Sequence, residues 1–298
     1  MLQWSWPIPA HPAPREVWAG KRNPHAAKTP GPQASPLLLS LLCVGAVGIG
    51  WVVWENSSPM VSTYTVSSPA VPAPFSGYRI AHISDLHNAE YGPDNQTLLD
   101  LLRDARPDLI VITGDLVDSY HPKPEISLAF SQQAVQIAPT YYVTGNHEAR
   151  IAAYPQLEAG LRAAGVTVLR NERAEIERDG AQLTLVGLDD PSFSVRPAEK
   201  GLEEALQRLL PDGDAERGYR VVLAHRPEYV ELYQRCGADL VFSGHAHGGQ
   251  FRLPGIGALA APGQGIFPTY TAGVYALGDT NMVVSRGLGN SSFPFRVN

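Results

Sequence analysis

The chain has few cysteines and no excess of basic residues. Its two cysteines, Cys43 and Cys236, lie far apart in 298 residues, which excludes a disulfide framework and leaves both as small apolar side chains. The 23 basic and 29 acidic residues give a formal net charge of −6. Because such a chain has no basic stripe for a phosphate backbone, we expect no nucleic-acid partner, and a nuclease is disfavoured.

Charge is absent altogether from one segment near the N-terminus. Residues 37–54 form an uncharged apolar run with Trp51 and Trp54 at its end. The run is just long enough to cross a bilayer as a helix. A cleaved signal peptide is the main alternative, but its apolar region is usually shorter, and no A-x-A-like cleavage site follows Trp54. We therefore expect an uncleaved transmembrane anchor.

Basic residues flank this run on one side only. Residues 1–36 hold eight prolines and four basic residues against one acidic residue, which predicts a disordered, Pro-rich basic tail. Residues 55–78 contain no Lys or Arg. The positive-inside rule then predicts a single-pass protein of the cell membrane with its body outside the cytoplasm. That body is predicted to comprise a linker over residues 55–75 and a folded domain over residues 76–298.

From residue 78 onward, apolar strand-like runs alternate with segments of helical spacing. The helical spacing is clearest over residues 95–105 and 200–210. The strand-like runs are residues 78–84, 108–114, 140–145, 183–188, 219–224 and 239–244. Such alternation predicts an α/β layered fold. The C-terminal segment differs and is typical of short strands joined by Gly and Asn turns.

Five of the six strand-like runs are followed by residues of the types that bind metals. These residues are Asp85 and His87, then Asp115, then Asn146 and His147, then His225, and finally His245 and His247. Because ligands bind outside the carboxyl ends of the strands in an open α/β sheet, we expect all of them at one sheet edge. Two histidines one residue apart would share one side of an extended segment. Such a pair on its own is more often part of a surface turn, but the other strand ends favour a common site.

The ligand atoms of these residues indicate which kind of metal ion would bind, and how many. Two carboxylates, one amide oxygen and several imidazoles suit Mn, Fe or Zn better than Mg or Ca, which prefer oxygen ligands throughout. The ligands are too many for one ion with an open position, whereas two divalent ions sharing the Asp115 carboxylate would use them all. A pair of ions about 3.5–4 Å apart serves in-line displacement at phosphorus.

The blocks "SDLH", "GDLVDS", "GNHE", "AHRPE" and "GHAHGGQ", in this order, resemble the calcineurin-like metallophosphoesterase superfamily over about residues 76–298. The last block and the closing "SRGLGN" are most similar to its branch of bacterial membrane-anchored phosphodiesterases. The resemblance implies a two-sheet α/β sandwich flanked by helices, the four-layer fold of that superfamily. It also implies a metal-dependent phosphoric ester hydrolase.

The resemblance further assigns roles to the residues of these blocks. It implies that one ion is held by Asp85, His87, Asp115 and His247. It implies that the other is held by Asp115, Asn146, His225 and His245. His147 is then not a ligand but the residue that assists the leaving oxygen. The glycines around His245 and His247 would let the backbone turn tightly and approach the ions and the phosphate.

The sequence differs from two other branches of the superfamily at residues that those branches use, which disfavours their activities. Ser119 and Thr144 stand where the serine/threonine protein phosphatases carry arginines that grip a phosphate, and Asp118 replaces the metal-binding Tyr of the purple acid phosphatases. Asn88 and Arg286 are candidate substrate-binding residues. Asn88 could equally cap a turn, and Arg286 could equally be a surface residue of a hairpin.

The sequence thus predicts a membrane-anchored bimetallic phosphoesterase that cleaves phosphodiester or pyrophosphate bonds by attack of a metal-bridged hydroxide. Its partners would be a phosphoester substrate and the membrane, and the anchor favours a lipid or envelope substrate. The alternatives are a nuclease and a non-catalytic scaffold that kept the fold and lost the metals. The scaffold is disfavoured because every ligand position of the resemblance is filled.

Overall fold

The computed structural model describes residues 35–210, 218–253, 255, 257–290 and 295–297. The chain divides into two units, residues 1–46 and 47–298. The predicted disordered tail, residues 1–36, lies almost wholly outside the described residues. Helix α1 (Pro36–Ser57) runs from the first unit into the second and extends beyond the predicted apolar run at both ends. Within the described chain it is the one helix long and apolar enough to cross a membrane, and none of its residues is buried.

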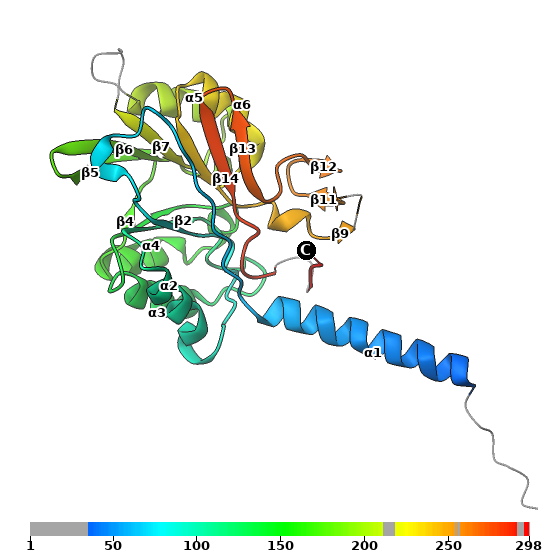
Figure 1. Ribbon diagram of the computed structural model, residues 1–298. Helices are drawn as coiled ribbons and strands as arrows, with labels where there is room; N and C mark the ends of the chain where they lie inside the picture. Colours follow the sequence, from blue (N-terminus) through cyan, green and yellow to red (C-terminus); the bar gives the residue numbers. More distant parts are fainter. Residues whose placement is uncertain (1–34, 211–217, 254, 256, 291–294, 298) are drawn as a thin grey trace, which may run out of the picture. The chain divides into compact units, whose positions relative to one another are not determined.

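Two β-sheets form the centre of the second unit (Figure 1). The first has four parallel strands in the order β1 (Ile80–Ile83), β2 (Leu109–Thr113), β3 (Thr140–Val143) and β4 (Thr167–Val168). The second has six strands in the order β13 (Gly273–Leu277), β14 (Thr280–Val284), β8 (Leu240–Ser243), β7 (Tyr219–Leu223), β6 (Ala181–Gly187) and β5 (Glu172–Arg178). Its four central strands are parallel, and its two edge strands, β13 and β5, pair antiparallel with their neighbours.

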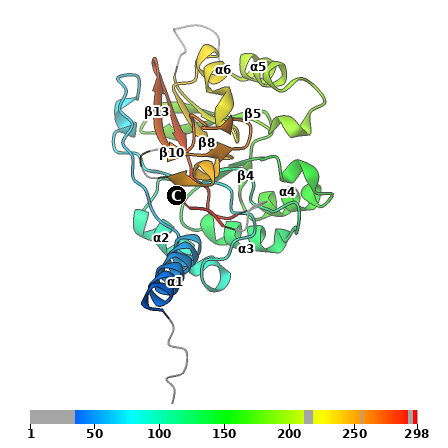
Figure 2. The same cartoon turned by 90° about the vertical axis from the view of Figure 1, so that its right-hand side faces the viewer.

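Helices cover the outer faces of both sheets (Figure 2). The first sheet is covered by α2 (Gln96–Ala105), α3 (Pro124–Ala134) and α4 (Tyr154–Ala163), and the second by α5 (Ala198–Leu209) and α6 (Val230–Arg235). A third apolar cluster fills the space between the two sheets. These four layers confirm the predicted two-sheet α/β sandwich.

Strand β2 shows why the central runs are almost entirely apolar. All five of its residues are buried, and they alternate between two cores. Ile110 and Ile112 face the helices, whereas Leu109 and Val111 face the other sheet. A strand covered on both faces therefore needs apolar residues at nearly every position, and in β2 only the last residue, Thr113, is polar.

The rest of the second unit consists of short elements. Single turns of 3-10 helix are η1 (Ala73–Phe75), η2 (Pro93–Asn95), η3 (Glu148–Arg150), η4 (Pro191–Phe193), η6 (Pro227–Tyr229) and η7 (His247–Gly249). Two small antiparallel pairs join β9 (Arg252–Leu253) to β10 (Gly257–Ala258) and β11 (Ala260–Ala261) to β12 (Gly265–Ile266). They stand to one side of the large sheet (Figure 1). Within the predicted linker, Val66 and Val71 pack against the cluster between the sheets.

Candidate metal centre

The predicted ligands follow strands of both sheets. Asp85, Asp115 and Asn146 come after β1, β2 and β3 of the four-stranded sheet, whereas His225 and His245 come after β7 and β8 of the six-stranded sheet. The expectation of one sheet edge is therefore wrong in this respect. The carboxyl ends of two facing sheets supply the site, because the sandwich brings both sets of strand ends to the same side.

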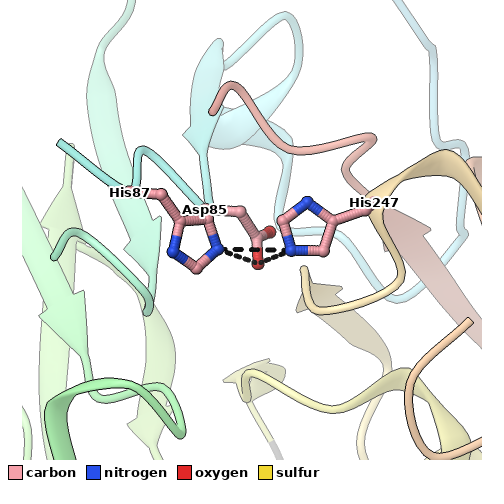
Figure 3. Close-up of side chains that lie close together, drawn as sticks. All are labelled: Asp85, His87 and His247. Carbon is pink, nitrogen blue, oxygen red and sulfur yellow. Dashed lines mark hydrogen bonds and ion pairs between the residues drawn. The ribbon is translucent and has the colours of Figure 1, made fainter. Parts of the chain in front are cut away.

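The first group of possible ligand atoms comprises Asp85, His87 and His247, which point toward one another (Figure 3). The Nε2 atoms of the two histidines lie 3.2 Å apart. They lie 3.9 and 3.6 Å from Oδ1 of Asp85, and all three residues are buried. Ligands about 2.1 Å from a tetrahedral ion stand about 3.4 Å from one another, so this spacing suits a transition-metal ion.

The second group comprises Asp115, His225 and His245. Oδ2 of Asp115 lies 3.2 Å from Nε2 of His225, and that nitrogen lies 3.1 Å from Nδ1 of His245. The same carboxylate oxygen lies 3.7 Å from Nε2 of His87 in the first group. Asp115 thus stands between the two groups, where a carboxylate shared by two ions would have to lie.

Asn146 supplies a further donor of the right kind. Its Oδ1 atom is buried and has no hydrogen-bond partner among the described residues. A buried carbonyl oxygen without a partner is rare because losing its contact with water costs free energy. Coordination of a cation would satisfy this oxygen, so the residues present fit a metal centre.

Burial sets the protonation of most of these histidines. It lowers the pKa of His87 to about 4, lowers that of His247, and lowers that of His245 well below the ordinary value. The imidazoles are therefore neutral near pH 7, which is the form that binds metals. Burial would also lower the pKa of His225, but the adjacent Asp115 carboxylate raises it to about 10.

A hydrogen bond fixes the orientation of the His225 ring. Its Nδ1 atom lies 2.7 Å from the carbonyl oxygen of Thr113 and donates to it. This bond turns Nε2 toward Asp115. Metal-binding histidines usually have such a backbone or carboxylate partner on the other ring nitrogen.

The backbone at five proposed ligands is left-handed. Asp85, His87, Asp115, His245 and His247 have φ angles of 54°, 46°, 53°, 65° and 47°. Non-glycine residues seldom adopt this conformation, which costs about 1–3 kcal/mol and gathers at functional sites. The expected extended segment at 245–247 is therefore wrong. The chain turns at both histidines, and their imidazoles enter different groups rather than one.

Two glycines are required by the close approach of these loops. A Cβ atom at Gly145 would overlap the carboxylate of Asp115. A Cβ atom at Gly244 would overlap the Ser84 hydroxyl and the Asp85 carboxylate. Larger residues at either position would displace a proposed ligand, which explains part of the glycine pattern around the histidines.

His147 lies beside the two ligand groups. Its ring centroid is 4.5 Å from that of His87, and with Asp118 the two histidines form a third, overlapping set of possible ligand atoms. The Ser119 N–H donates to Nδ1 of His147 over 2.9 Å. Because Nδ1 accepts this bond, a neutral ring carries its proton on Nε2. The same ring nitrogen lies 3.4 Å from Oδ1 of Asp118, where a protonated ring would find an acceptor.

Glu148 was not among the predicted site residues, yet it holds the loops of the centre together. Its fully buried carboxylate accepts hydrogen bonds from the backbone N–H groups of Asp115, Leu116 and Gly145 over 2.9, 2.8 and 2.8 Å. Burial, with Asp115 nearby, raises its pKa to about 7. Glu148 therefore ties the loop that carries Asp115 to the loop that carries Asn146. The only signal in the sequence was its place at the end of the "GNHE" block.

The two candidate substrate residues have partners elsewhere in the protein. The side-chain amide of Asn88 donates to the His121 carbonyl over 2.9 Å and accepts from the Lys123 N–H over 3.3 Å, so it braces a loop. Arg286 donates to the Ser62 hydroxyl over 2.9 Å. Neither belongs to the groups of ligand atoms, and substrate binding by either residue stays a prediction.

A family model described as calcineurin-like phosphoesterase matches residues 78–249. The chain belongs to this family, which confirms the resemblance seen in its motifs. An uncharacterized metallophosphoesterase of Bacillus subtilis, YkuE, is 31% identical over 271 residues, 87% of this chain and 90% of the relative. The phosphodiesterase YaeI of Escherichia coli is 32% identical over 236 residues, 74% of this chain and 78% of the relative.

Two more distant proteins are also similar. A transmembrane protein with a metallophosphoesterase domain from Danio rerio is 27% identical over 273 residues, 87% of this chain and 60% of the relative. The crystal structure of TT1561 of Thermus thermophilus is 17% identical, with a TM-score of 0.49 over 71% of this chain and 90% of that one.

Proposed function

We propose that the protein is a bimetallic phosphoesterase that cleaves phosphodiester or pyrophosphate bonds. The observation that carries this proposal is the position of Asp115 between two groups of buried ligand atoms. The centre would hold two divalent transition-metal ions (Mn, Fe or Zn). Asp85, His87 and His247 would hold one ion, and Asn146, His225 and His245 would hold the other. Asp115 would be a ligand of both.

In the proposed cleavage the metal ligands and His147 have different roles. When bound, two such ions polarise the phosphoryl oxygens and lower the pKa of a water molecule. Asp115 and the histidines would hold these ions, and these side chains are themselves buried away from bulk water. His147 in its imidazolium form would give its Nε2 proton to the leaving oxygen, which would otherwise depart as a costly alkoxide, and would return to the neutral ring. Oδ1 of Asp118, 3.4 Å from Nδ1, is the acceptor for the second N–H of that imidazolium.

A diester or pyrophosphate fits better than a phosphoserine monoester. Thr144 and Ser119, at the positions where the protein phosphatases carry arginines, have no charge with which to grip a terminal phosphate. The curated name of the Escherichia coli relative, a phosphodiesterase, supports the same direction.

We further propose that α1 anchors the protein in the cell membrane with the body outside the cytoplasm. Its length and composition support this, as does the curated name of the Danio rerio relative. The anchor favours a substrate carried by a lipid or by the cell envelope. A scaffold without metals is disfavoured by the completeness of both groups, and a nuclease by the acidic composition.

The decisive experiment uses the full chain purified in detergent under metal-replete conditions. Elemental analysis should find about two transition-metal ions per chain, and bis(p-nitrophenyl) phosphate should be hydrolysed. The same sample is then given glycerophosphodiesters, lipid pyrophosphates and phosphomonoesters in parallel. A protein without bound metal would overturn the proposal, and a preference for monoesters would overturn its diesterase part.

A further inference from the structure

Large apolar side chains are exposed on the small strands β9 to β12 and on the C-terminal segment. We call the described residues of 251–267, which leave out 254 and 256, the hairpin lobe. In it Leu253, Ile266 and Phe267 are 43, 76 and 64% exposed, and Phe295 beside it is 45% exposed. The backbone of Phe267 is left-handed, with a φ of 55°. Exposed large apolar residues that cluster in this way mark a surface that contacts a protein or a membrane.

Hydrogen bonds tie this lobe to the last turn of α1. Nδ2 of Asn56 donates to the Arg296 carbonyl over 2.8 Å, and Oδ1 of Asn56 accepts from the Arg296 N–H over 3.0 Å. The next residue, Val297, accepts from the Arg252 N–H over 2.7 Å and forms a bridge with Phe251. The segment 296–297 thus joins the end of α1 on one side to the start of the lobe on the other.

The pairing continues to the tip of the lobe. The Leu259 N–H donates to the Phe251 carbonyl over 2.8 Å, and the Phe267 N–H donates to the Leu259 carbonyl over 2.9 Å. Neighbouring paired segments lie about 4.8 Å apart. Three such steps lead from Phe267 to the segment 296–297, which binds Asn56, so the two are at most roughly 15 Å apart. The exposed apolar residues are therefore close to the point where α1 meets the domain.

The length of α1 leaves the domain little distance from a bilayer. Its 22 residues extend about 33 Å, and the hydrocarbon core of a bilayer is about 30 Å thick. Trp51 and Trp54, residues of the type that gathers at membrane interfaces, lie within about one and a half turns before Asn56. A spanning helix would therefore bring Asn56 and the lobe to the headgroup level.

The charge of the lobe suits that position. Residues 253–267 of the lobe contain no Asp, Glu, Lys or Arg, although the chain has a net charge of −6. The one charged residue of the lobe, Arg252 at its start, donates to the Gly248 carbonyl and the Thr271 hydroxyl. Acidic side chains would be repelled by anionic headgroups, whereas an uncharged apolar surface is free to enter the interface. The lobe is thus the part of the domain whose chemistry matches a bilayer surface.

We propose that the hairpin lobe docks into the interface of the bilayer that α1 crosses, with Leu253, Ile266 and Phe267 among the lipids. This inference rests on the proposed membrane anchor. The loop that carries His245 and His247 leads directly into the lobe, so docking holds the metal centre near the headgroups. The site then meets phosphoesters carried by lipids in preference to soluble ones.

The test labels the lobe of the full chain with an environment-sensitive fluorophore. Ile266→Cys is made in a Cys43→Ala, Cys236→Ala background, labelled with nitrobenzoxadiazole, and reconstituted into phosphatidylcholine and phosphatidylglycerol vesicles. The matched control is Val195→Cys, an equally apolar residue that is 106% exposed between η4 and α5. We expect the emission of the lobe label to shift to the blue and to be quenched by a nitroxide-labelled lipid, and the control label to do neither.

Flotation of the vesicles separates the two proposals. Protein that floats with an unshifted lobe label overturns the docking proposal and leaves the anchor intact. Protein that stays at the bottom of the gradient overturns both. A label that shifts without nitroxide quenching shows burial against protein, such as a second copy of the chain, and also overturns docking to lipid.

Discussion

Oδ2 of Asp115 lies 3.2 Å from Nε2 of His225 and thereby joins the two sheets of the sandwich at the metal centre. Asp115 follows β2 of the four-stranded sheet, and His225 follows β7 of the six-stranded sheet. The pair forms only when the sheets pack face to face. Folding and assembly of the centre would therefore be coupled, because an ion bound there would stabilise the packed state alone.

Replacing Asp115 should remove both ions. Asp115→Asn keeps the size of the side chain but loses the charge that two cations would share. We expect metal content to fall to near zero and activity to fall more than about 100-fold, beyond the 10–100-fold typical of residues that only orient ligands. Elemental analysis and hydrolysis of bis(p-nitrophenyl) phosphate measure both. Asp100→Asn on the exposed face of α2 is the control, and a metal-replete Asp115→Asn protein would contradict the bridging role.

Replacing His147 should slow proton transfer without releasing metal. His147→Ala is expected to lower turnover by roughly 10²–10⁴-fold on diesters with poor leaving groups. The loss should be smaller on p-nitrophenyl esters, whose leaving group needs no proton. His121→Ala, an exposed histidine of the neighbouring loop, should leave both rates unchanged. Equal losses on both substrates, or a loss of metal, would assign His147 to another role.

Replacing Glu148 should weaken metal binding without a change of fold. Glu148→Gln puts an NH₂ group where the carboxylate accepts backbone N–H bonds, so the loops of Asp115 and Asn146 lose their common partner. We expect metal affinity to fall about 10–100-fold, as for other residues that orient ligands. A metal titration measures the affinity, and circular dichroism of the same sample checks that the fold is unchanged. Glu158→Gln, at a partly exposed residue, is the control. Unchanged affinity would limit Glu148 to a role in packing.

Two glycine substitutions should act in opposite directions. Gly244→Ala forces a methyl group against Ser84 and Asp85 and should destabilise the fold by about 1–3 kcal/mol. Gly201→Ala lies inside α5 with no close neighbour and should stabilise by about 0.5–1 kcal/mol, because alanine loses less entropy in a helix. Urea denaturation in detergent measures both changes. A stable, metal-replete Gly244→Ala protein would show that the loop can shift freely.

The orientation of the anchor can be read from reporter fusions. Four basic residues precede α1, and none occurs in residues 55–78, so the body should face outward. Alkaline phosphatase fused after Asn298 should be active, and green fluorescent protein at the same point should be dark. External protease should digest the body in intact spheroplasts while a cytosolic control survives. A fluorescent, protected fusion would reverse the orientation.

The sequence by itself determined the family, the layered fold and six of its strands, five of which lead into the site. The reason is local, because strands covered on both faces are almost entirely apolar, as in β2, and the turns after them carry short motifs whose order can be recognised without any structure. It did not predict the edge strands β4 and β5, which are short or largely polar. It did not predict α3, since Ser127 and Ser131 are buried on the face that packs inward and blur the apolar period.

The tertiary structure decided which ligands meet. Spacing placed His245 and His247 on one side of an extended segment, but left-handed backbone at both residues sends them to different groups, which is the division that the family resemblance implied. Glu148 and the two-sheet origin of the site were equally invisible in the sequence. Contacts between Glu148 and Asp115, and between Asp115 and His225, join residues 33 and 110 positions apart. The pairing of β2 with β3 brings the first two together, and the packing of the two sheets brings the second two together.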